Sequence, residues 1–196
     1  ARLALVDPTQ RKRETVLFDD YGIEGRLSPD GQRVLFMREG ESWWRQGYRG
    51  SRGGQLWLFD KTAASFTLLK RDSFENRSPL WRSDGKGFYY LSNRTGTQNL
   101  WLHDLVSKKD TQLTQFTGDS VVFPVISRDG STLVFRSCFD LYRWTPGSKE
   151  PALVEIVAPL ADDSRQPERI WLDKAGDASF TKDGLEVAFI SGGDVW

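Results

Sequence analysis

The sequence predicts an all-β protein: a β-propeller segment built of four-stranded antiparallel blades. Two repeated patterns carry this prediction. The first is an Asp-Gly pair between two apolar runs, which occurs at Asp30, Asp84, Asp129 and Asp183, at intervals of 54, 45 and 54 residues. Asp-Gly in this setting is a strong hairpin signal, because Gly adopts positive φ without steric cost and Asp tolerates it. A period of this size with several short strands per repeat is typical of propeller blades.

The second pattern is a short run of aromatic and aliphatic residues between the Asp-Gly pairs. Residues 56–60 read Leu-Trp-Leu-Phe-Asp and residues 100–104 read Leu-Trp-Leu-His-Asp, with looser copies at 3–7, 141–144 and 195–196. Such runs suit a half-buried pleated sheet. We expect the first strand of each blade before Asp-Gly, the second after it, the third at this run and the fourth beyond it.

This strand grammar divides a single propeller segment, residues 1–196, into blades. Fuller blades are expected at 24–71, 78–116 and 122–157, and partial blades at 1–20 and 174–196. The total is about four blades' worth, the low end of the usual range of about four to eight. Because the chain begins and ends inside a blade, we expect a segment of a longer propeller. The alternative is a small ring closed by pairing the first two strands with the last three.

Composition narrows the classes of function. Lys plus Arg and Asp plus Glu both total 27, so the formal net charge is zero, which argues against a nucleic-acid partner. No apolar run approaches the roughly 18 residues of a membrane span, and the start does not resemble a signal peptide, which leaves cytoplasmic and periplasmic locations both open. Cys138, the single cysteine, lies in an apolar run and is expected in the core.

Catalytic and cofactor signals are missing from the sequence. His103 is the single histidine, and the repeat explains both it and Asp104 as strand residues. We find no Gly-x-Ser-x-Gly elbow, phosphate loop or zinc-type His/Cys spacing. The turns account for the repeated aspartates. We therefore expect no catalytic residue, metal or cofactor in this segment.

One connection is unusually long and rich in aromatic and basic residues. Residues 39–54 join the second and third strands of the first full blade, and residues 158–173 form a second long connection. Strand parity places both on the face opposite the Asp-Gly turns. Long loops on a rigid scaffold commonly carry binding. The candidate peptide- or partner-binding residues are Trp43, Trp44, Arg45, Tyr48, Arg49 and Arg52. The alternative is that the aromatic side chains fold back on their own blade and the arginines are solvated.

The same stretches carry a family resemblance. The Ser-Pro-Asp-Gly blades resemble TolB-type and peptidase-associated propeller repeats. The succession of residues 44–57, 129–135 and 167–170 closely resembles the six-bladed N-terminal propeller of the tricorn protease family, serine peptidases of the tail-specific class. Ser83-Asp84-Gly85 lacks the proline, and the last blade is unfinished. The resemblance implies a propeller that is not the catalyst but acts as a gated passage or filter for peptides, with the catalytic groups in later domains.

Three functions are consistent with these patterns. The first is a non-catalytic propeller of a tricorn-like peptidase that gates or channels peptides and docks to the remaining domains of its parent. The second is a TolB-like propeller that binds protein partners in the bacterial envelope. The third is the propeller of a prolyl-oligopeptidase-type hydrolase. Downstream sequence would discriminate them: a tail-specific serine site supports the first, and an α/β-hydrolase elbow the third.

An incomplete ring leaves unpaired strands at its ends, and such edges invite pairing with another chain. We predict that the 196-residue chain self-associates through these open edges. Static light scattering over a concentration series measures this directly. A monodisperse monomer at high concentration would contradict the prediction and favour the small closed ring.

Overall fold

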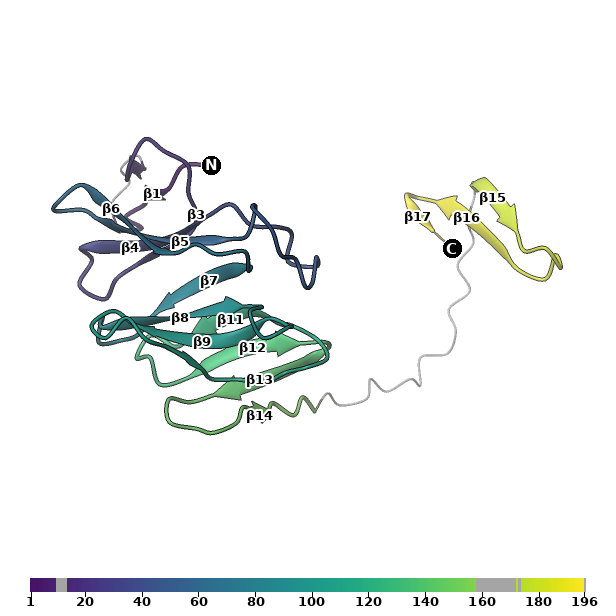
Figure 1. Cartoon of the computed structure of the whole chain (residues 1–196). Helices are drawn as coiled ribbons and strands as arrows, with labels where there is room; N and C mark the ends of the chain where they lie inside the picture. The colour runs from purple at the N-terminus through teal and green to yellow at the C-terminus, as the bar shows by residue number, and fades with distance from the viewer. Residues whose placement is uncertain (10–13, 158–171, 173, 196) are drawn as a thin grey trace. The chain divides into compact units, whose positions relative to one another are not determined.

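A computed structural model of the chain describes residues 1–9, 14–157, 172 and 174–195. The chain divides into two compact units, Ala1–Glu155 and Ile156–Trp196 (Figure 1). The described residues form strands, turns and bends without any helix, which confirms the all-β prediction. No helix suited to crossing a membrane is therefore found in this part of the chain.

The first unit contains one hairpin and three four-stranded antiparallel sheets. We name them the leading hairpin (β1–β2), sheet I (order β3-β4-β5-β6), sheet II (β7-β8-β9-β10) and sheet III (β11-β12-β13-β14). In each sheet, neighbours in sequence are neighbours in space, which is the meander expected of a propeller blade. The strands are β1 (Ala4–Leu5), β2 (Thr15–Val16), β3 (Ile23–Leu27), β4 (Arg33–Arg38), β5 (Gln55–Asp60), β6 (Ser65–Lys70), β7 (Asn76–Trp81), β8 (Gly87–Ser92), β9 (Asn99–Asp104), β10 (Asp110–Gln112), β11 (Val121–Ile126), β12 (Leu133–Ser137), β13 (Asp140–Trp144) and β14 (Ala152–Leu153).

The second unit is a three-stranded antiparallel meander. Its strands are β15 (Gly176–Phe180), β16 (Val187–Ser191) and β17 (Asp194–Val195), in the order β15-β16-β17. Asp183 and Gly184 lie in the turn between the first two strands, so this unit repeats the pattern of sheets I to III. Together, the sheets of the two units confirm the propeller-segment prediction.

The core of the first unit lies between sheets that pack face to face. Successive side chains of a strand point to opposite faces of its sheet. In β8, Phe88 and Tyr90 therefore join the apolar cluster shared with sheet I, while Tyr89 and Leu91 join the cluster shared with sheet III. All six residues of β8 are buried. A third cluster packs sheet I against the leading hairpin.

In each Asp-Gly turn the two residues have different roles. Each glycine is left-handed, with φ of 72°, 66°, 74° and 71° at Gly31, Gly85, Gly130 and Gly184. Each aspartate instead accepts hydrogen bonds. Asp30 Oδ1 accepts from Gln32 N (3.0 Å) and Ser28 Oγ (2.5 Å). The equivalent hydrogen bond from Ser127, together with those from the backbone and side chain of Ser131, lowers the pKa of Asp129 to about 2. Only glycine uses the left-handed region here, so the tolerance of Asp for this region is not needed.

A β-bulge recurs in the first strand of sheets I to III and of the meander in the second unit, and it was not predicted from the sequence. The pairing of the first and second strands shifts register at equivalent places in β3, β7, β11 and β15. The residues with positive φ at these places are Glu24, Ser78, Phe123 and Asp177. Each lies six positions before the aspartate of its turn. Bulges of this kind bend a strand and re-aim its side chains.

Cys138 is a correction to the sequence-based prediction. The residue is exposed rather than in the core. Ser137 and Asp140 pair across β12 and β13, so Cys138 and Phe139 form the turn between them, and Cys138 has a φ of 53°. Strand β12 therefore ends two residues before the hydrophobic run of residues 133–139 does, because the two-residue turn leaves both of its side chains exposed.

The face-to-face core predicts the cost of truncating its side chains. Leu91 is 1% exposed and lies between sheets II and III, whereas Leu153 is 59% exposed. Leu91→Ala should lower the free energy of unfolding by about 2–5 kcal/mol, because it removes buried methyl groups and leaves a cavity. Leu153→Ala should cost less than about 1 kcal/mol. Urea unfolding followed by tryptophan fluorescence measures the free energy of unfolding of both variants. Equal losses would contradict the placement of Leu91 in the core and of Leu153 at the surface.

Candidate functional site

The candidate site is the connection between β4 and β5, residues 39–54, which we call the aromatic loop. Because β3, β4 and β5 are antiparallel neighbours, this connection leaves sheet I at the end opposite the Asp30–Gly31 turn. All six candidate binding residues lie in it. The second long connection, residues 158–173, lies outside the described residues apart from Leu172, so the predicted placement of both loops on one face stays a prediction.

A buried carboxylate holds the base of the aromatic loop. Glu75, which is 1% exposed, precedes β7 of sheet II. Its Oε1 accepts a hydrogen bond from Glu41 N (3.1 Å), and its Oε2 accepts one from Gly54 N (3.2 Å). One side chain of sheet II therefore closes both ends of a loop from sheet I. Gly54 permits this approach, since a Cβ there would lie 2.3 Å from the Asn76 carbonyl oxygen.

The environment of Glu75 opposes its negative charge. Burial raises the pKa of the Glu75 carboxyl, and the nearby Arg77 guanidinium and the two backbone donors only partly offset this effect. Arg77 in turn donates from Nη2 to the carbonyl oxygen of Glu41 (3.1 Å). The loop base is thus a small polar network in which each group depends on the others for its partners.

The tip of the aromatic loop reaches sheet III. The ring of Trp43 packs edge-on against Phe123 of β11, with centroids 4.9 Å apart. The Arg136 guanidinium of β12 lies 5.3 Å from the Trp43 ring and 5.2 Å from the Phe123 ring. Phe123 is the bulge residue of its strand, so the bulge presents this ring to the loop. The aromatic loop therefore runs from sheet I, past the start of sheet II, to sheet III, and Trp43 does not fold back on its own blade.

The remaining aromatic residues differ in what they leave exposed. Trp44 stacks edge-on against Trp43 at 5.7 Å and is 67% exposed, while Trp43 is 39% exposed. Tyr48 is half-buried, and its carbonyl oxygen accepts a hydrogen bond from Asn93 Nδ2 at 2.9 Å. Trp44 is thus the aromatic side chain of the loop that is best placed to meet a partner.

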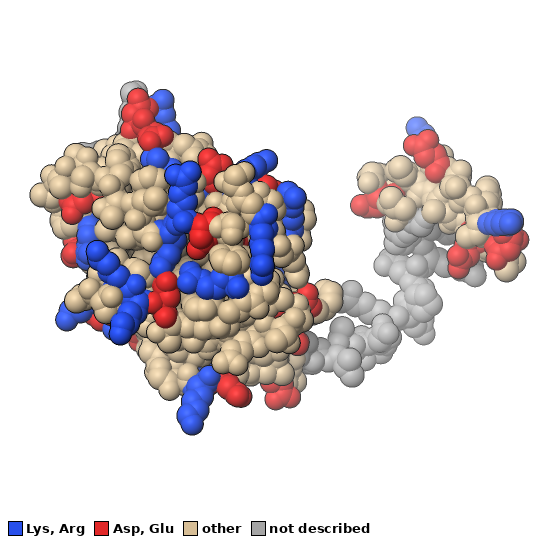
Figure 2. Space-filling view, in the orientation of Figure 1, with Lys and Arg blue, Asp and Glu red and all other residues tan. Residues whose placement is uncertain are grey.

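The arginines of the aromatic loop contact neighbouring side chains, two of them within the loop and one outside it. Arg45 and Arg52 both pair with the Glu41 carboxylate, at 3.0 and 3.5 Å, and the Arg45 guanidinium lies 4.7 Å from the Tyr48 ring. Arg49 lies 5.2 Å from the Phe74 ring. In Figure 2, basic and acidic side chains are interspersed over the visible face of the first unit. The loop therefore offers less free positive charge than its three arginines suggest.

His103 lies in β9 as a buried strand residue. Its Nδ1 lies 2.9 Å from Asp110 Oδ1, and Lys70 and Arg94 approach the other oxygen of the same carboxylate, Asp110 Oδ2. Within the described ranges, no group of three or more His, Cys, Asp or Glu residues is placed to hold a metal ion. His103 is therefore engaged in a structural ion-pair cluster between sheets I and II.

Sequence reasoning found the aromatic loop but missed the residues that hold it. Glu75, Phe123 and Arg136 come from three strands or strand ends far from the loop in sequence. Nothing in their local sequence distinguishes them. The one available signal was an acidic residue next to an expected strand start, since buried carboxylates require donors.

The architecture defines the class of protein: the chain is part of a β-propeller of antiparallel four-stranded blades. Residues 1–150 match the tricorn protease N-terminal beta propeller domain, and the chain belongs to this family.

Individual relatives agree with this assignment. A tricorn protease homolog from Saccharolobus solfataricus is 26% identical over 152 residues, covering 77% of this chain and 14% of that protein. A crystal structure of the tricorn protease shares 26% identity with a TM-score of 0.57, over 85% of this chain and 16% of that one. TolB from Acinetobacter baumannii has a TM-score of 0.57 at 17% identity, over 92% of this chain and 44% of its own, which shows a shared fold alone. The chain spans about one seventh of the curated relative it matches.

The Glu75 network predicts a specific loosening of the aromatic loop. Glu75→Ala removes the acceptor of two backbone N–H groups, that of Gly54 in a buried hydrogen bond and that of Glu41 in a partly buried one. A buried N–H left unsatisfied costs about 1–3 kcal/mol. Trypsin should then cleave after Arg45, Arg49 or Arg52 faster, relative to cleavage elsewhere in the chain. Glu39→Gln, an exposed change in the same loop, is the matched control and should leave the cleavage pattern unchanged. Unaltered loop protection in Glu75→Ala would show that the carboxylate does not hold the loop.

Proposed function

We propose that this propeller is a non-catalytic part of a tricorn-like peptidase, which gates or channels peptides and docks to the catalytic domains through the aromatic loop. The observation that carries the proposal is the course of that loop across three sheets, anchored by Glu75 at its base and by Trp43 at its tip. In a propeller, the first strand of each blade lies nearest the central axis. Glu75 borders the first strand of sheet II and Phe123 lies in the first strand of sheet III, so the loop lies over the axial ends of the blades.

A loop in this position controls access to the axis. Its two anchors differ in kind: the Glu75 contacts are buried and partly buried hydrogen bonds, whereas the Trp43 contacts are exposed ring contacts worth about 0.5–1.5 kcal/mol per pair. The tip can therefore detach while the base holds. Detachment would free the faces of Trp43 and Phe123 for a passing peptide, and Trp44 would meet either that peptide or a neighbouring domain. The peptidase chemistry itself would belong to other domains of the parent protein.

The competing function is that of a TolB-like propeller, which would bind protein partners. The feature that favours it is the exposed Trp44 ring, since aromatic anchors dominate protein interfaces. The two functions make different demands on Trp43. A gate needs Trp43 to move off Phe123, whereas a rigid docking surface needs it to stay.

Because the arginines of the loop already have partners, we predict that its aromatic side chains supply most of the affinity for a peptide. Exposed ion pairs contribute about 0–1 kcal/mol each. Replacing Trp43, Trp44 and Tyr48 by alanine should therefore weaken peptide binding more than replacing Arg45, Arg49 and Arg52. Fluorescence anisotropy with a labelled octapeptide bearing a free carboxyl terminus measures both variants.

Two single variants sharpen this test. Trp44→Ala should weaken binding by about 1–2 kcal/mol, because the ring is exposed and free to contact a ligand. Phe139→Ala removes an aromatic ring that is 95% exposed on another hairpin, and it should have no effect. Equal losses in the two variants, or a larger loss on removing the arginines, would contradict the assignment of the site.

A further inference from the structure

Three equivalent grooves run between neighbouring sheets on the outer side of the first unit. Each is formed by the last strand of one sheet, or the residues after it, together with the third strand and following turn of the next. Their volumes are about 470 Å³ between the leading hairpin and sheet I, 460 Å³ between sheets I and II, and 350 Å³ between sheets II and III. The turn contributes one lysine to the lining of each groove: Lys61, Lys108 and Lys149, respectively.

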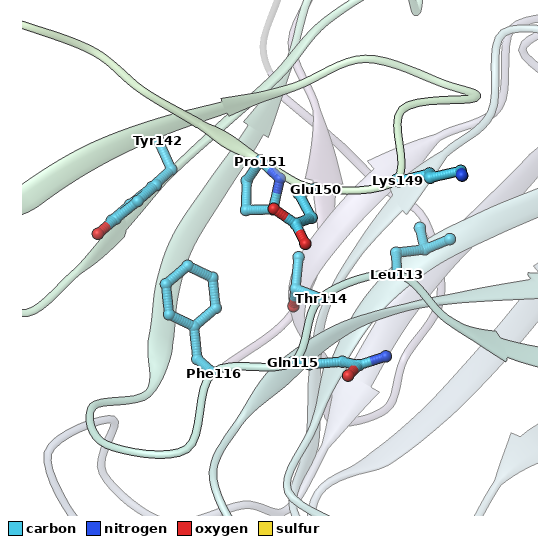
Figure 3. Close-up of a pocket in the computed structure, with 8 residues that line it drawn as sticks. All are labelled: Leu113, Thr114, Gln115, Phe116, Tyr142, Lys149, Glu150 and Pro151. Carbon is cyan, nitrogen blue, oxygen red and sulfur yellow. The ribbon is translucent and has the colours of Figure 1, made fainter.

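The charge of these grooves differs although their construction is the same. Asp7 lines the first groove together with Lys61, and Glu150 lines the third together with Lys149. Figure 3 shows the Glu150 carboxylate directed towards Thr114 inside the third groove, while Lys149 points away from it. The groove between sheets I and II, which we call the middle groove, is lined by Arg33, Lys70, Lys108 and His103, and none of its lining residues is acidic.

The Asp110 carboxylate next to the middle groove does not neutralise the positive charge of the groove. Asp110 is the one carboxylate that Lys70, Arg94 and His103 share, at 2.5, 3.3 and 2.9 Å. Burial would raise the pKa of Asp110, but the hydrogen bonds from His103 and Lys70 outweigh this and lower it. Asp110 therefore carries its full charge, yet it faces two permanent cations. A net positive charge remains even before Lys108 is counted.

Lys108 stands apart from this cluster. It lies in the turn after β9 with a φ of 56°, and in the described part of the chain it takes part in no ion pair. Arg33 is held at the other side of the groove by the carbonyl oxygen of Gly85 (3.0 Å) and by Asp30 (3.8 Å). Lys108 is thus the cation of the middle groove that is available to a ligand.

Leucine side chains give the middle groove apolar surface beside its cations. Leu58, Leu68, Leu69 and Leu105 line it. Strand β6, which contributes residues 67–70 of the lining, is the edge strand of sheet I, and in the described sheets it pairs with β5 alone. An edge strand offers backbone donors and acceptors to an extended peptide. This apolar surface also favours an organic anion over inorganic phosphate.

We propose that the middle groove binds an extended acidic peptide segment, in which carboxylate side chains alternate with leucine-like ones. Carboxylates would meet Lys108 and the Lys70 cluster, and the apolar side chains would pack on the four leucines. This site is separate from the aromatic loop and does not depend on the function proposed for it.

The test uses the full chain and a fluorescent hexapeptide of alternating leucine and glutamate with both termini blocked. The blocked ends restrict the charge to side chains. We expect saturable binding that weakens as ionic strength rises, because salt screens the attraction. Replacing each glutamate of the peptide by glutamine should weaken binding by at least about tenfold, since charge-assisted hydrogen bonds are lost. Equal binding of the two peptides would overturn the proposal.

Charge reversal locates the site. Lys108→Glu should weaken binding of the acidic hexapeptide by about tenfold, a loss of roughly 1.4 kcal/mol. Lys149→Glu places the same change in the equivalent turn of the third groove and should leave the Kd within about twofold of the unaltered chain. Trp44→Ala should also leave it unchanged, which separates this site from the aromatic loop. If Lys149→Glu or Trp44→Ala abolished binding, the peptide would bind elsewhere. The same would follow if Lys108→Glu bound the peptide as tightly as the unaltered chain.

Discussion

Strand β8 shows the constraint on which the first unit depends: a blade whose two faces are both apolar is stable only between two other sheets. Phe88 and Tyr90 need sheet I, while Tyr89 and Leu91 need sheet III. The first cluster forms only when sheets I and II pack together, and the second only when sheets II and III do. This mutual dependence fixes the spacing between blades. It therefore also fixes the distances over which the aromatic loop, the ion-pair cluster of Asp110 and the outer grooves are built.

The aromatic loop connects sheets I, II and III, whose spacing is fixed in this way. Glu75 ties its base to sheet II through buried and partly buried hydrogen bonds, and Trp43 ties its tip to sheet III through ring contacts with Phe123 and Arg136. The base is strongly held because an unsatisfied buried N–H is costly, whereas the exposed tip contacts are weak. The two ends of the loop are therefore held more strongly than its tip.

The sequence predicted the parts of this structure that local chemistry decides. The Asp-Gly turns and the Leu-Trp-Leu strands follow from backbone preference and side-chain alternation, and sheets I to III show both. The bulges could not be predicted, since Glu24, Ser78, Phe123 and Asp177 share no side-chain property. The partners of Trp43 and the role of Glu75 depend on contacts across blades, which no local pattern encodes. Cys138 was misplaced because a hydrophobic run does not show where a hairpin turns.

The constant distance between bulge and turn has a consequence for how such chains can vary in length. The bulge residue precedes the turn aspartate by six positions in all four copies, although the copies are spaced 54, 45 and 54 residues apart. One residue added inside that interval would turn every following side chain to the opposite face of its sheet. Insertions and deletions are therefore confined to the connections between strands, such as residues 39–54. The sequence of these connections can change while the packed scaffold keeps its register.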